Sequence, residues 1–379
     1  MQGYVDSEIL AGVSHAVIKG RDLIEWHCAG KADRENNIAL RADHIFRAFS
    51  NTKLITSCAI LLLLDDGKLQ LDDRLDRYIP QLGNRRVLKP GASSLNDTEP
   101  ALGPITLRHL LSHSSGLSYG LLDPGTTIFK AYNERKVMNP MTPLSAMIDQ
   151  LSDLPLVFHP GTGWEYSVAT DVLSRVLEII SGQRFDEFLQ TRIFDRLGMH
   201  DTGFVVAKDQ QHRLAAYYKG ADLFNPLKPG LTRIDDSPYP GAYVTTVPRL
   251  SGGGGLVSTL PDMIALIRSL LPGGPTLLRA ETIAQMMTNQ LSAGAHVRFP
   301  GTGQVLGKGF GLAGAVTLEP SALDPQDSVG ELQWGGIAGT HWWISPKSGL
   351  AGILMTQRLM AFWHPYSFEF KRLVHAAIA

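Results

Sequence analysis

The stretch from Leu54 to Leu64 constrains the fold most, because it is apolar on nearly every face when it is read as a helix. A helix of this kind is stable only where other parts of the chain surround it. It is expected to end at Asp65-Asp66-Gly67, where the glycine suits the position after the last turn. With 379 residues, of which 44% are hydrophobic, the chain is long enough to build that surrounding core.

Short apolar segments separated by turns occur at both ends of the chain. Residues 14–18 and 23–28 predict an antiparallel hairpin, with its turn at 19–22. Near the other end, residues 333–345 predict one strand, 346–349 a turn and 350–356 a second strand. A final helix, opened by Pro365, is expected to bury one face, formed by Tyr366, Phe370, Leu373, Val374 and Ala377.

The middle of the chain is rich in loops and helices, with helices expected at 107–113, 143–152 and 168–180. The simplest packing joins the two ends into one antiparallel sheet and inserts the middle as a second lobe. We therefore predict an α+β fold, with a sheet domain of residues 1–75 and 250–379 flanked by helices. Residues 76–249 would form a mainly helical domain, and clefts between such lobes are favoured places for sites.

The charge balance excludes several classes of partner. Lys and Arg together number 35 and Asp and Glu 36, a net charge of -1, so the basic stripe typical of nucleic-acid binders is absent. No apolar run approaches the roughly 20 residues of a membrane span. The two cysteines, Cys28 and Cys58, form no C-x-x-C pair. We expect a cytoplasmic protein whose partner is a small molecule; the oligomeric state stays open.

The segment Ser50-Asn51-Thr52-Lys53 directly precedes the apolar helix. As an ordinary N-cap, Ser50 would be followed by Glu or Gln at the position that Lys53 occupies. A cation there faces the positive end of the helix dipole and enters a buried segment, so two local rules are broken together. Because residues three apart share a helix face, Lys53 can approach and help to activate the Ser50 hydroxyl.

Two other patterns are weaker candidates. Residues 116–120 match G-x-S-x-G around Ser118, but that nucleophile elbow needs a strand before it and a helix after it, which the sequence does not predict. His109 and His113 stand four apart, as metal ligands can, without the Glu of H-E-x-x-H or a third ligand. A hydrogen-bonded role for His113 is favoured, and neither a metal nor a cofactor is expected.

Three further segments have an ordinary structural explanation when each is taken alone. Ser167 could cap the helix that begins near Val168, while Tyr166 packs against that helix. Trp334-Gly335-Gly336 could be a strand with a bulge. The four glycines 252–255 lie between ordered neighbours, which predicts that the backbone passes close to another part of the molecule there.

Together, in their order and spacing, these segments resemble the serine β-lactamase and penicillin-binding-protein superfamily. They are similar above all to the family VIII carboxylesterases, which are related to class C β-lactamases. The resemblance extends from about residue 9 to the C-terminus. It rests on five segments: 46–53, 110–117, 166–167, 253–259 and 334–336.

The resemblance implies a role for each matching residue. Ser50 would be the acylated nucleophile, Lys53 its partner and Tyr166 the general base. The backbone N–H groups of Ser50 and Ile337 would form the oxyanion hole. The substrate site would be lined by Trp334, Gly335, Gly336, Val168 and His113.

Two departures from the β-lactamase pattern favour an uncharged ester as the substrate. Trp334 stands where β-lactamases have the Lys of K-T-G, and Val168 replaces the Asn of Y-x-N. We therefore expect a serine esterase for short-chain acyl esters that works through an acyl-enzyme on Ser50. A β-lactamase or D,D-peptidase, an acyltransferase and a covalent acyl-binding sensor remain alternatives that use the same serine.

Overall fold

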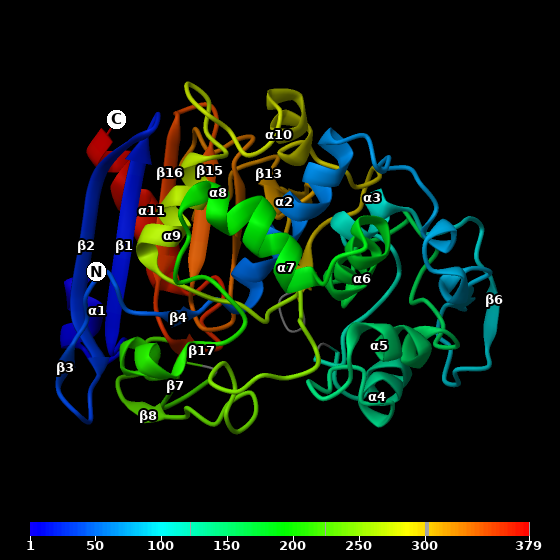
Figure 1. The fold of residues 1–379 in the computed structure, drawn as a ribbon, viewed down its shortest axis with the longest axis horizontal. Coiled ribbons are helices and arrows are strands. Elements are labelled where there is room, and N and C mark those ends of the chain that lie inside the picture. The colour runs from blue at the N-terminus through cyan, green and yellow to red at the C-terminus, as the bar shows by residue number, and fades with distance from the viewer. Residues whose placement is uncertain (122, 224, 300–302, 379) are drawn as a thin grey trace.

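The computed structural model describes residues 1–121, 123–223, 225–299 and 303–378. Its centre is an eight-stranded sheet in the order β12-β13-β14-β15-β16-β1-β2-β3 (Figure 1). The bounds of these strands are β1 Gly12–Lys19, β2 Asp22–Asp33, β3 Ile38–Ala39, β12 Lys308–Phe310, β13 Ala315–Thr317, β14 Leu332–Gly335, β15 His341–Ser345 and β16 Leu350–Met355. The helices are α1 Gln2–Asp6, α2 Thr52–Asp65, α3 Leu107–Leu111, α4 Thr127–Glu134, α5 Leu144–Leu151, α6 Ala169–Ser181, α7 Phe185–Leu189, α8 Asp195–Leu197, α9 Leu260–Arg268, α10 Ala280–Met286 and α11 Pro365–Ile378.

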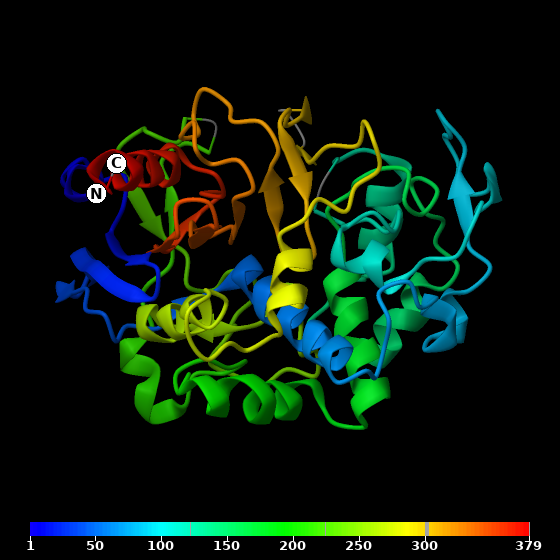
Figure 2. The same cartoon turned by 90° about the horizontal axis from the view of Figure 1, so that it is seen from above.

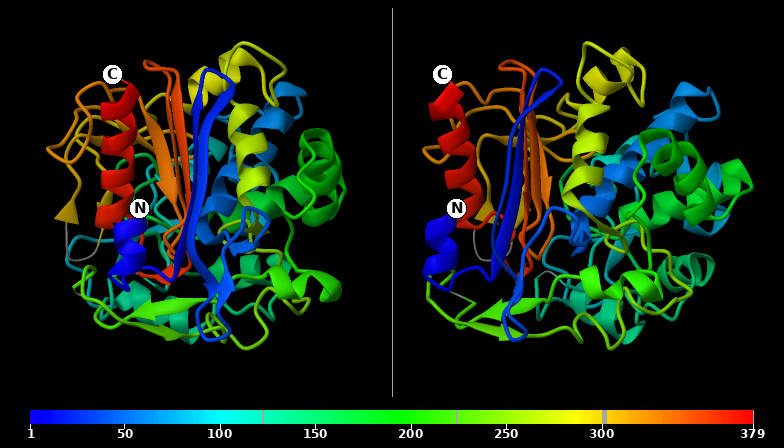
Figure 3. Two further views of the ribbon diagram at one scale, coloured as in Figure 1. Left: turned by 90° about the vertical axis from the view of Figure 1, so that its left-hand side faces the viewer. Right: turned by 60° about the vertical axis from the view of Figure 1, so that its left-hand side comes forward.

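The sheet is built from both ends of the chain, as the sequence predicted. Strand β1 pairs antiparallel with β16 in a register that sets Ser14 opposite Met355, and it pairs on its other side with β2. Helices α1 and α11 cover one face of the sheet, and α9 and α2 lie on the other (Figure 3). The predicted α+β class and the antiparallel sheet are therefore confirmed.

One predicted strand is wrong. Residues 333–345 form two antiparallel strands, β14 and β15, with Trp334 opposite Trp342. The chain turns between them at residues 336–340, where Gly339 donates its N–H to the Gly336 carbonyl at 2.9 Å and has a φ of 81°. Glycine is needed at 339, because a Cβ there would lie 2.0 Å from the Tyr366 hydroxyl.

Helix α2 is buried on all sides from Thr52 to Leu63, as its apolar sequence predicted. It lies between the sheet and the helices of the middle segment, against α6 and α7 (Figure 2). The expected helices at 143–152 and 168–180 correspond to α5 and α6, and α6 is followed by Gly182 in the left-handed conformation. Within the described residues, no helix combines the length and the apolar character that crossing a bilayer requires.

The face predicted for the C-terminal helix is partly wrong. Tyr366, Phe370 and Val374 of α11 are buried, but Leu373 is 43% exposed, and Ala377 is exposed too. The helix buries Lys371 instead, whose ammonium donates to Asp324 at 2.9 Å and to Glu331 at 2.7 Å. The buried face of the helix thus includes a cation that is paired with two buried carboxylates, which hydrophobicity alone does not select.

The remaining short strands form small ribbons: β4 Phe46–Arg47 with β9 Val257–Ser258, β5 Arg86–Leu88 with β6 Thr98–Pro100, β10 Arg298–Phe299 with β11 Gly303–Gln304, and β7 Tyr218–Gly220 with β8 Leu231–Arg233 and β17 Arg358–Leu359. The ribbon of β7 and β8 comes from the predicted helical segment, yet β7 pairs with β17 near the C-terminus. The division into residues 1–75 with 250–379 and residues 76–249 stays a proposal.

Candidate active site

Ser50 lies in a short helical turn, Phe49–Asn51, immediately before α2. The turn forces Phe49 to a φ of 43°, a left-handed conformation that costs energy for a residue with a side chain. Asn51 occupies the N-cap position and makes no side-chain capping bond. Ser50 is therefore not a capping residue, and its hydroxyl is free for other contacts.

The three residues that the sequence singled out lie in contact. The Tyr166 hydroxyl donates to the Ser50 Oγ at 2.7 Å, and the Lys53 Nζ donates to the same Oγ at 3.4 Å. The Lys53 ammonium also lies 4.5 Å from the centre of the Tyr166 ring. The serine hydroxyl is thus within proton-transfer distance of one phenol, and that phenol lies beside a cation.

Lys53 is buried without a carboxylate partner among the described residues. Its Nζ donates to the carbonyl oxygen of Gly253 at 2.6 Å, and the Tyr119 ring centre lies 5.6 Å away. Carbonyl dipoles and aromatic faces stabilise a cation without neutralising it. The glycine run 252–255 is the predicted close approach, because a Cβ on Gly252 would lie 1.9 Å from the Ser174 hydroxyl.

His113 holds the backbone next to Tyr166. Ser167 donates its backbone N–H to the Nδ1 of His113 at 3.2 Å, and its hydroxyl lies 3.0 Å from the same nitrogen. The imidazole lies 5.0 Å from the Tyr166 ring, centre to centre. Burial, together with the nearby Lys53 cation, lowers the pKa of His113 well below its ordinary value, so the ring is neutral.

Trp334 packs inside a cluster of aromatic rings beside Tyr166. Its Nε1 lies 3.5 Å from the Tyr166 hydroxyl, and its side chain is almost fully buried. Its ring contacts lie between 4.9 and 6.4 Å, centre to centre, and involve Trp164, Tyr166, Phe299, Phe310, Phe362 and Trp363. The indole therefore supports the tyrosine from one side.

The end of β14 approaches the turn that holds Ser50. A Cβ on Gly336 would lie 2.6 Å from the carbonyl oxygen of Ala48, and Thr340 donates its hydroxyl to that oxygen at 3.1 Å. Among the described residues, neither the backbone N–H of Ser50 nor that of Ile337 has an acceptor. Two unpaired donors thus belong to segments that touch each other beside the serine.

The structure gives Val168 and Ser118 structural positions. Val168 is fully buried in the core at the start of α6. Ser118 is buried as well, and its hydroxyl donates to the Glu165 carboxylate at 3.0 Å. The segment around Ser118 follows α3 and precedes α4 without the strand–turn–helix arrangement of a nucleophile elbow.

His109 and His113 make separate contacts. The Nδ1 of His109 accepts the backbone N–H of Thr106 at 3.2 Å as part of a capping box. Within the part of the chain that the structure describes, no three His, Cys, Asp or Glu side chains gather as metal ligands do.

Sequence reasoning missed an ionic network directly behind Tyr166. Glu165 is buried, and its carboxylate pairs with Arg298 of β10. Arg298 also binds Asp123 at 2.7 Å, in the loop between α3 and α4. No local pattern marks these three residues, because they are far apart in sequence and meet only in the folded chain.

The chain is similar to known proteins over most of its length. The sequence model described as Beta-lactamase matches residues 1–363. Esterase EstB of Burkholderia gladioli is 31% identical over 92% of this chain and 86% of its own length. Lovastatin esterase of Penicillium rubens is 34% identical over 84% of this chain and 80% of its own. The solved structure of EstCE1, a hydrolase with promiscuous acyltransferase activity, matches with a TM-score of 0.82 and 25% identity, over 99% of this chain and 96% of that one.

Proposed function

The chain belongs to the Beta-lactamase family, and on that premise we propose that it is a serine carboxylesterase acting on short-chain acyl esters. Two curated relatives are named as esterases, and the chain is similar to both over most of their length. The observation that supports this function most is the 2.7 Å hydrogen bond between Tyr166 and Ser50, with Lys53 beside both. A nucleophile, a base and a neighbouring cation suffice for acyl transfer without a metal or a cofactor.

The reaction begins when the Tyr166 oxygen, as a phenolate beside the Lys53 cation, takes the proton of the Ser50 hydroxyl. The Ser50 Oγ then attacks the ester carbonyl carbon, and the N–H groups of Ser50 and Ile337 stabilise the oxyanion. Each such donor contributes about 3 kcal/mol. When the intermediate collapses, the C–O bond to the alcohol breaks, and Tyr166 returns the proton to the leaving alkoxide. Water repeats the sequence on the acyl-enzyme and releases the carboxylic acid.

The residues around the site favour an uncharged substrate. Trp334 places an indole where a charged residue would recognise a carboxylate, and the neighbouring aromatic rings make this wall apolar. Arg298 is bound by both Asp123 and Glu165, so it is not free to attract an anion. We assign Trp334, Gly335 and Gly336 to this wall. His113 and Val168 lie beneath it as supports for Tyr166 and α6, and their contact with a substrate stays a prediction.

The test is hydrolysis of p-nitrophenyl esters of graded chain length by wild type and by Ser50→Ala. The alanine variant should fold normally and lose turnover, because no other serine of the site contacts Tyr166 in the described residues. Ser118→Ala is the matched control and should keep activity within about tenfold. If Ser118→Ala lost turnover and Ser50→Ala kept it, the proposed nucleophile would be wrong. Chelators should leave the activity unchanged.

An acyltransferase is the second candidate, favoured by the structural match to a hydrolase with promiscuous acyltransferase activity. Both reactions share the acyl-enzyme and differ only in whether water or another alcohol accepts the acyl group. Adding a small alcohol during ester turnover separates them. Transfer would give a new ester that rises with alcohol concentration, whereas a strict hydrolase would release only acid. The expected cytoplasmic location stays a prediction, which cell fractionation would check.

A further inference from the structure

Strand β2 leaves one edge of the main sheet open. The short strand β3 pairs only with Lys31 and Asp33, at the end of β2. From Asp22 to His27, β2 is exposed at every residue, with Ile24 at 47% and Trp26 at 54%. Figure 1 shows β2 as the outermost long strand, and Figure 3 turns this edge toward the viewer. A long apolar edge strand is a ready template for another strand.

The hydrogen bonds at one end of β2 establish which backbone groups face outward. The Lys31 N–H donates inward to Ala11 at 2.7 Å, whereas the Gly30 carbonyl accepts outward from Leu40 at 3.0 Å. Since the directions alternate along a strand, and the register with β1 is regular from Gly30 to Glu25, Trp26 and Cys28 must also face outward. Among the described residues, nothing bonds to these outward groups.

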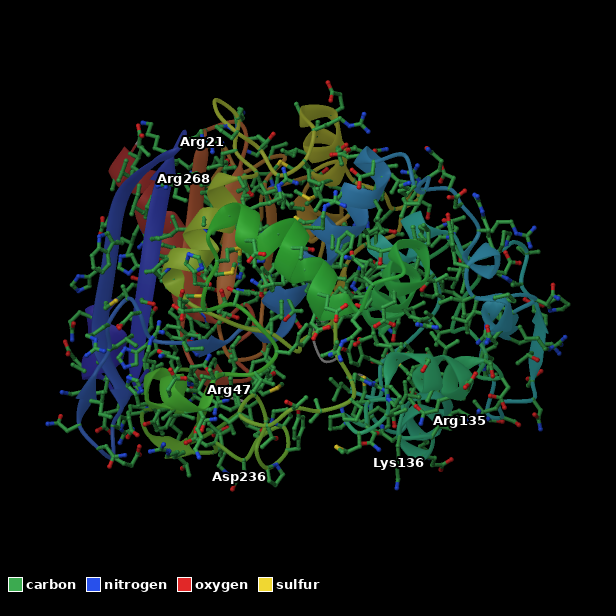
Figure 4. All side chains as sticks on the ribbon, in the orientation of Figure 1. Arg21, Arg47, Arg135, Lys136, Asp236 and Arg268 are labelled. Atoms are coloured by element: carbon green, nitrogen blue, oxygen red, sulfur yellow. The ribbon has the colours of Figure 1, made fainter. Side chains whose placement is uncertain are left out.

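The edge is held in place at the hairpin tip. Arg21, at the tip of the β1–β2 hairpin, donates to the carbonyl oxygens of Leu271 at 2.8 Å and Pro275 at 3.0 Å. Figure 4 labels this arginine at the end of the hairpin. The pairing of β2 with β1 shifts its register at Ile24, so it is regular only from Glu25 toward Gly30. The regular, outward-facing template is therefore centred on Trp26.

We propose that β2 pairs antiparallel with β2 of a second copy of this chain, about a twofold axis at Trp26, to form a dimer with a continuous sheet. Charge favours this register over the two neighbouring registers, in which like residues would lie opposite each other. Pairing Ile24 with Trp26 of the second copy would set Glu25 opposite Glu25, and pairing Trp26 with Cys28 would set His27 opposite His27. With Trp26 opposite Trp26, Glu25 faces His27 twice.

The spacing in this register favours the polar pairs. Trp26 and its copy form the hydrogen-bonded pair, so Glu25 and His27 occupy non-hydrogen-bonded positions, where opposite Cα atoms approach to about 4.5 Å. Glu25 lies 3.4 Å from His15 in its own chain, so it is already held on the face that His27 shares. Such a contact is self-complementary, which is the condition for a twofold dimer.

The ladder is short, because Leu40 already occupies the Gly30 carbonyl. Residues 25–27 of each chain can pair within the regular part of the strand, which is a small interface, so the dimer should be weak and depend on concentration. The edge lies four strands from β14, or about 19 Å at the usual strand spacing. Ester turnover per chain should therefore be the same in monomer and dimer, so a failed dimer test would leave the proposed activity untouched.

The test is sedimentation of the full chain over a hundredfold range of concentration. Wild type should pass from monomer to dimer. Glu25→Lys should raise the dissociation constant at least tenfold, and His27→Lys should lower it. The double variant Glu25→Lys with His27→Glu restores opposite charges only in the Trp26-centred register, so it should regain the wild-type constant.

Glu281→Lys, at an exposed position on α10 outside this edge, carries the same charge change and should behave as wild type. Unchanged ester turnover in each variant verifies that the chain is folded. A wild type that stays monomeric throughout, or a dimer that Glu25→Lys does not weaken, would overturn the proposal. A dimer that the double variant fails to restore would overturn the register.

Discussion

The ammonium group of Lys53 donates a hydrogen bond of 2.6 Å to the carbonyl oxygen of Gly253, 200 residues further along the chain. This bond joins α2 to the glycine loop and sets the position of the cation between Ser50 and Tyr166. The loop can approach only because it lacks side chains. A Cβ on Gly253 would lie 2.6 Å from an Asp171 carboxylate oxygen and 3.1 Å from the Tyr119 hydroxyl.

Gly253→Ala should therefore lower ester turnover by moving the carbonyl that holds Lys53. A hydrogen bond to a charged group contributes about 1.5–3 kcal/mol, so kcat/KM should fall roughly ten- to a hundredfold. Gly254→Ala is the matched control, because a Cβ there has no neighbour closer than 3.7 Å. Steady-state kinetics on both variants decide the matter, and equal losses would contradict a specific role for Gly253.

Substitutions of Lys53 and Tyr166 should reduce ester turnover non-additively. Both contact the same hydroxyl of Ser50, and residues of a single proton-transfer network act non-additively. The double variant Lys53→Ala with Tyr166→Phe should therefore be little worse than the poorer single variant. The measurement is kcat for the three variants and wild type. Losses that multiply in full would show that the two residues act independently.

The buried charges under α11 should dominate the stability of that helix. Lys371 binds Asp324 and Glu331, and removing one partner of a buried ion pair typically costs about 3–5 kcal/mol. Lys371→Met should lower the free energy of unfolding by about that amount, as measured by urea denaturation. Arg372→Met changes the exposed neighbour of Lys371 and should have almost no effect. If both variants lost a similar amount of unfolding free energy, the buried ion pairs of Lys371 would not be the cause of the loss.

His341 should make the protein less stable in acid. Burial, followed by the cations of Lys371 and Lys308, lowers the pKa of His341 to about 3. Unfolded histidine binds its proton near pH 6.5, so between these values the unfolded chain binds more protons and stability falls with falling pH, by up to about 1.4 kcal/mol per unit.

Urea denaturation at about pH 7 and about pH 5 tests this pH dependence. His341→Gln should reduce the loss of stability between the two conditions, whatever its effect at neutral pH. His212→Gln is the control, because that histidine is exposed at the surface. If the unfolding free energy of both variants fell with pH as steeply as that of wild type, protonation of His341 would not contribute to the loss of stability in acid.

Local patterns predicted those parts of the molecule that local rules govern. The all-round apolar helix, the hairpin at residues 14–28 and the approach of glycines 252–255 each follow from spacing and residue type, and the structure confirms them. The family was predictable because its motifs keep their order, and the match over residues 1–363 confirms it. The narrower assignment to the family VIII carboxylesterases stays a prediction.

The errors have a common physical origin in long-range contacts. Residues 333–345 contain tryptophans and isoleucines at both ends of the segment, which favours one strand, and only the packing of Gly339 against Tyr366 reveals the turn. Lys371 breaks the apolar face of α11, because its partners lie 40 and 47 residues away. Arg298 reaches Glu165 from 133 residues away. Pairings of this kind leave no periodic signal in the sequence.

The aromatic rings around Trp334 should disfavour substrates that carry a carboxylate. Trp334 lies 5.4 Å from the Tyr166 ring, centre to centre, and packs against Phe310 and Phe362, so this side of the site is built from aromatic rings. A β-lactam carboxylate at this wall would lack a cationic partner, which costs about 1.5–3 kcal/mol. With Val168 in place of a polar residue, two such losses should leave cephalosporin turnover at least about a hundredfold below that of short esters in kcat/KM.

Two variants at Trp334 separate charge from packing. Trp334→Lys should narrow the gap between cephalosporin and ester, because it supplies the missing cation and disturbs the aromatic support of Tyr166. Trp334→Phe keeps an aromatic ring without the indole N–H, so it should preserve the gap and cost esters only a few-fold. The assay compares a chromogenic cephalosporin with a short p-nitrophenyl ester on all three proteins. A wild type that prefers the cephalosporin would show that the indole does not exclude carboxylate substrates, because the same serine and backbone donors serve both carbonyls.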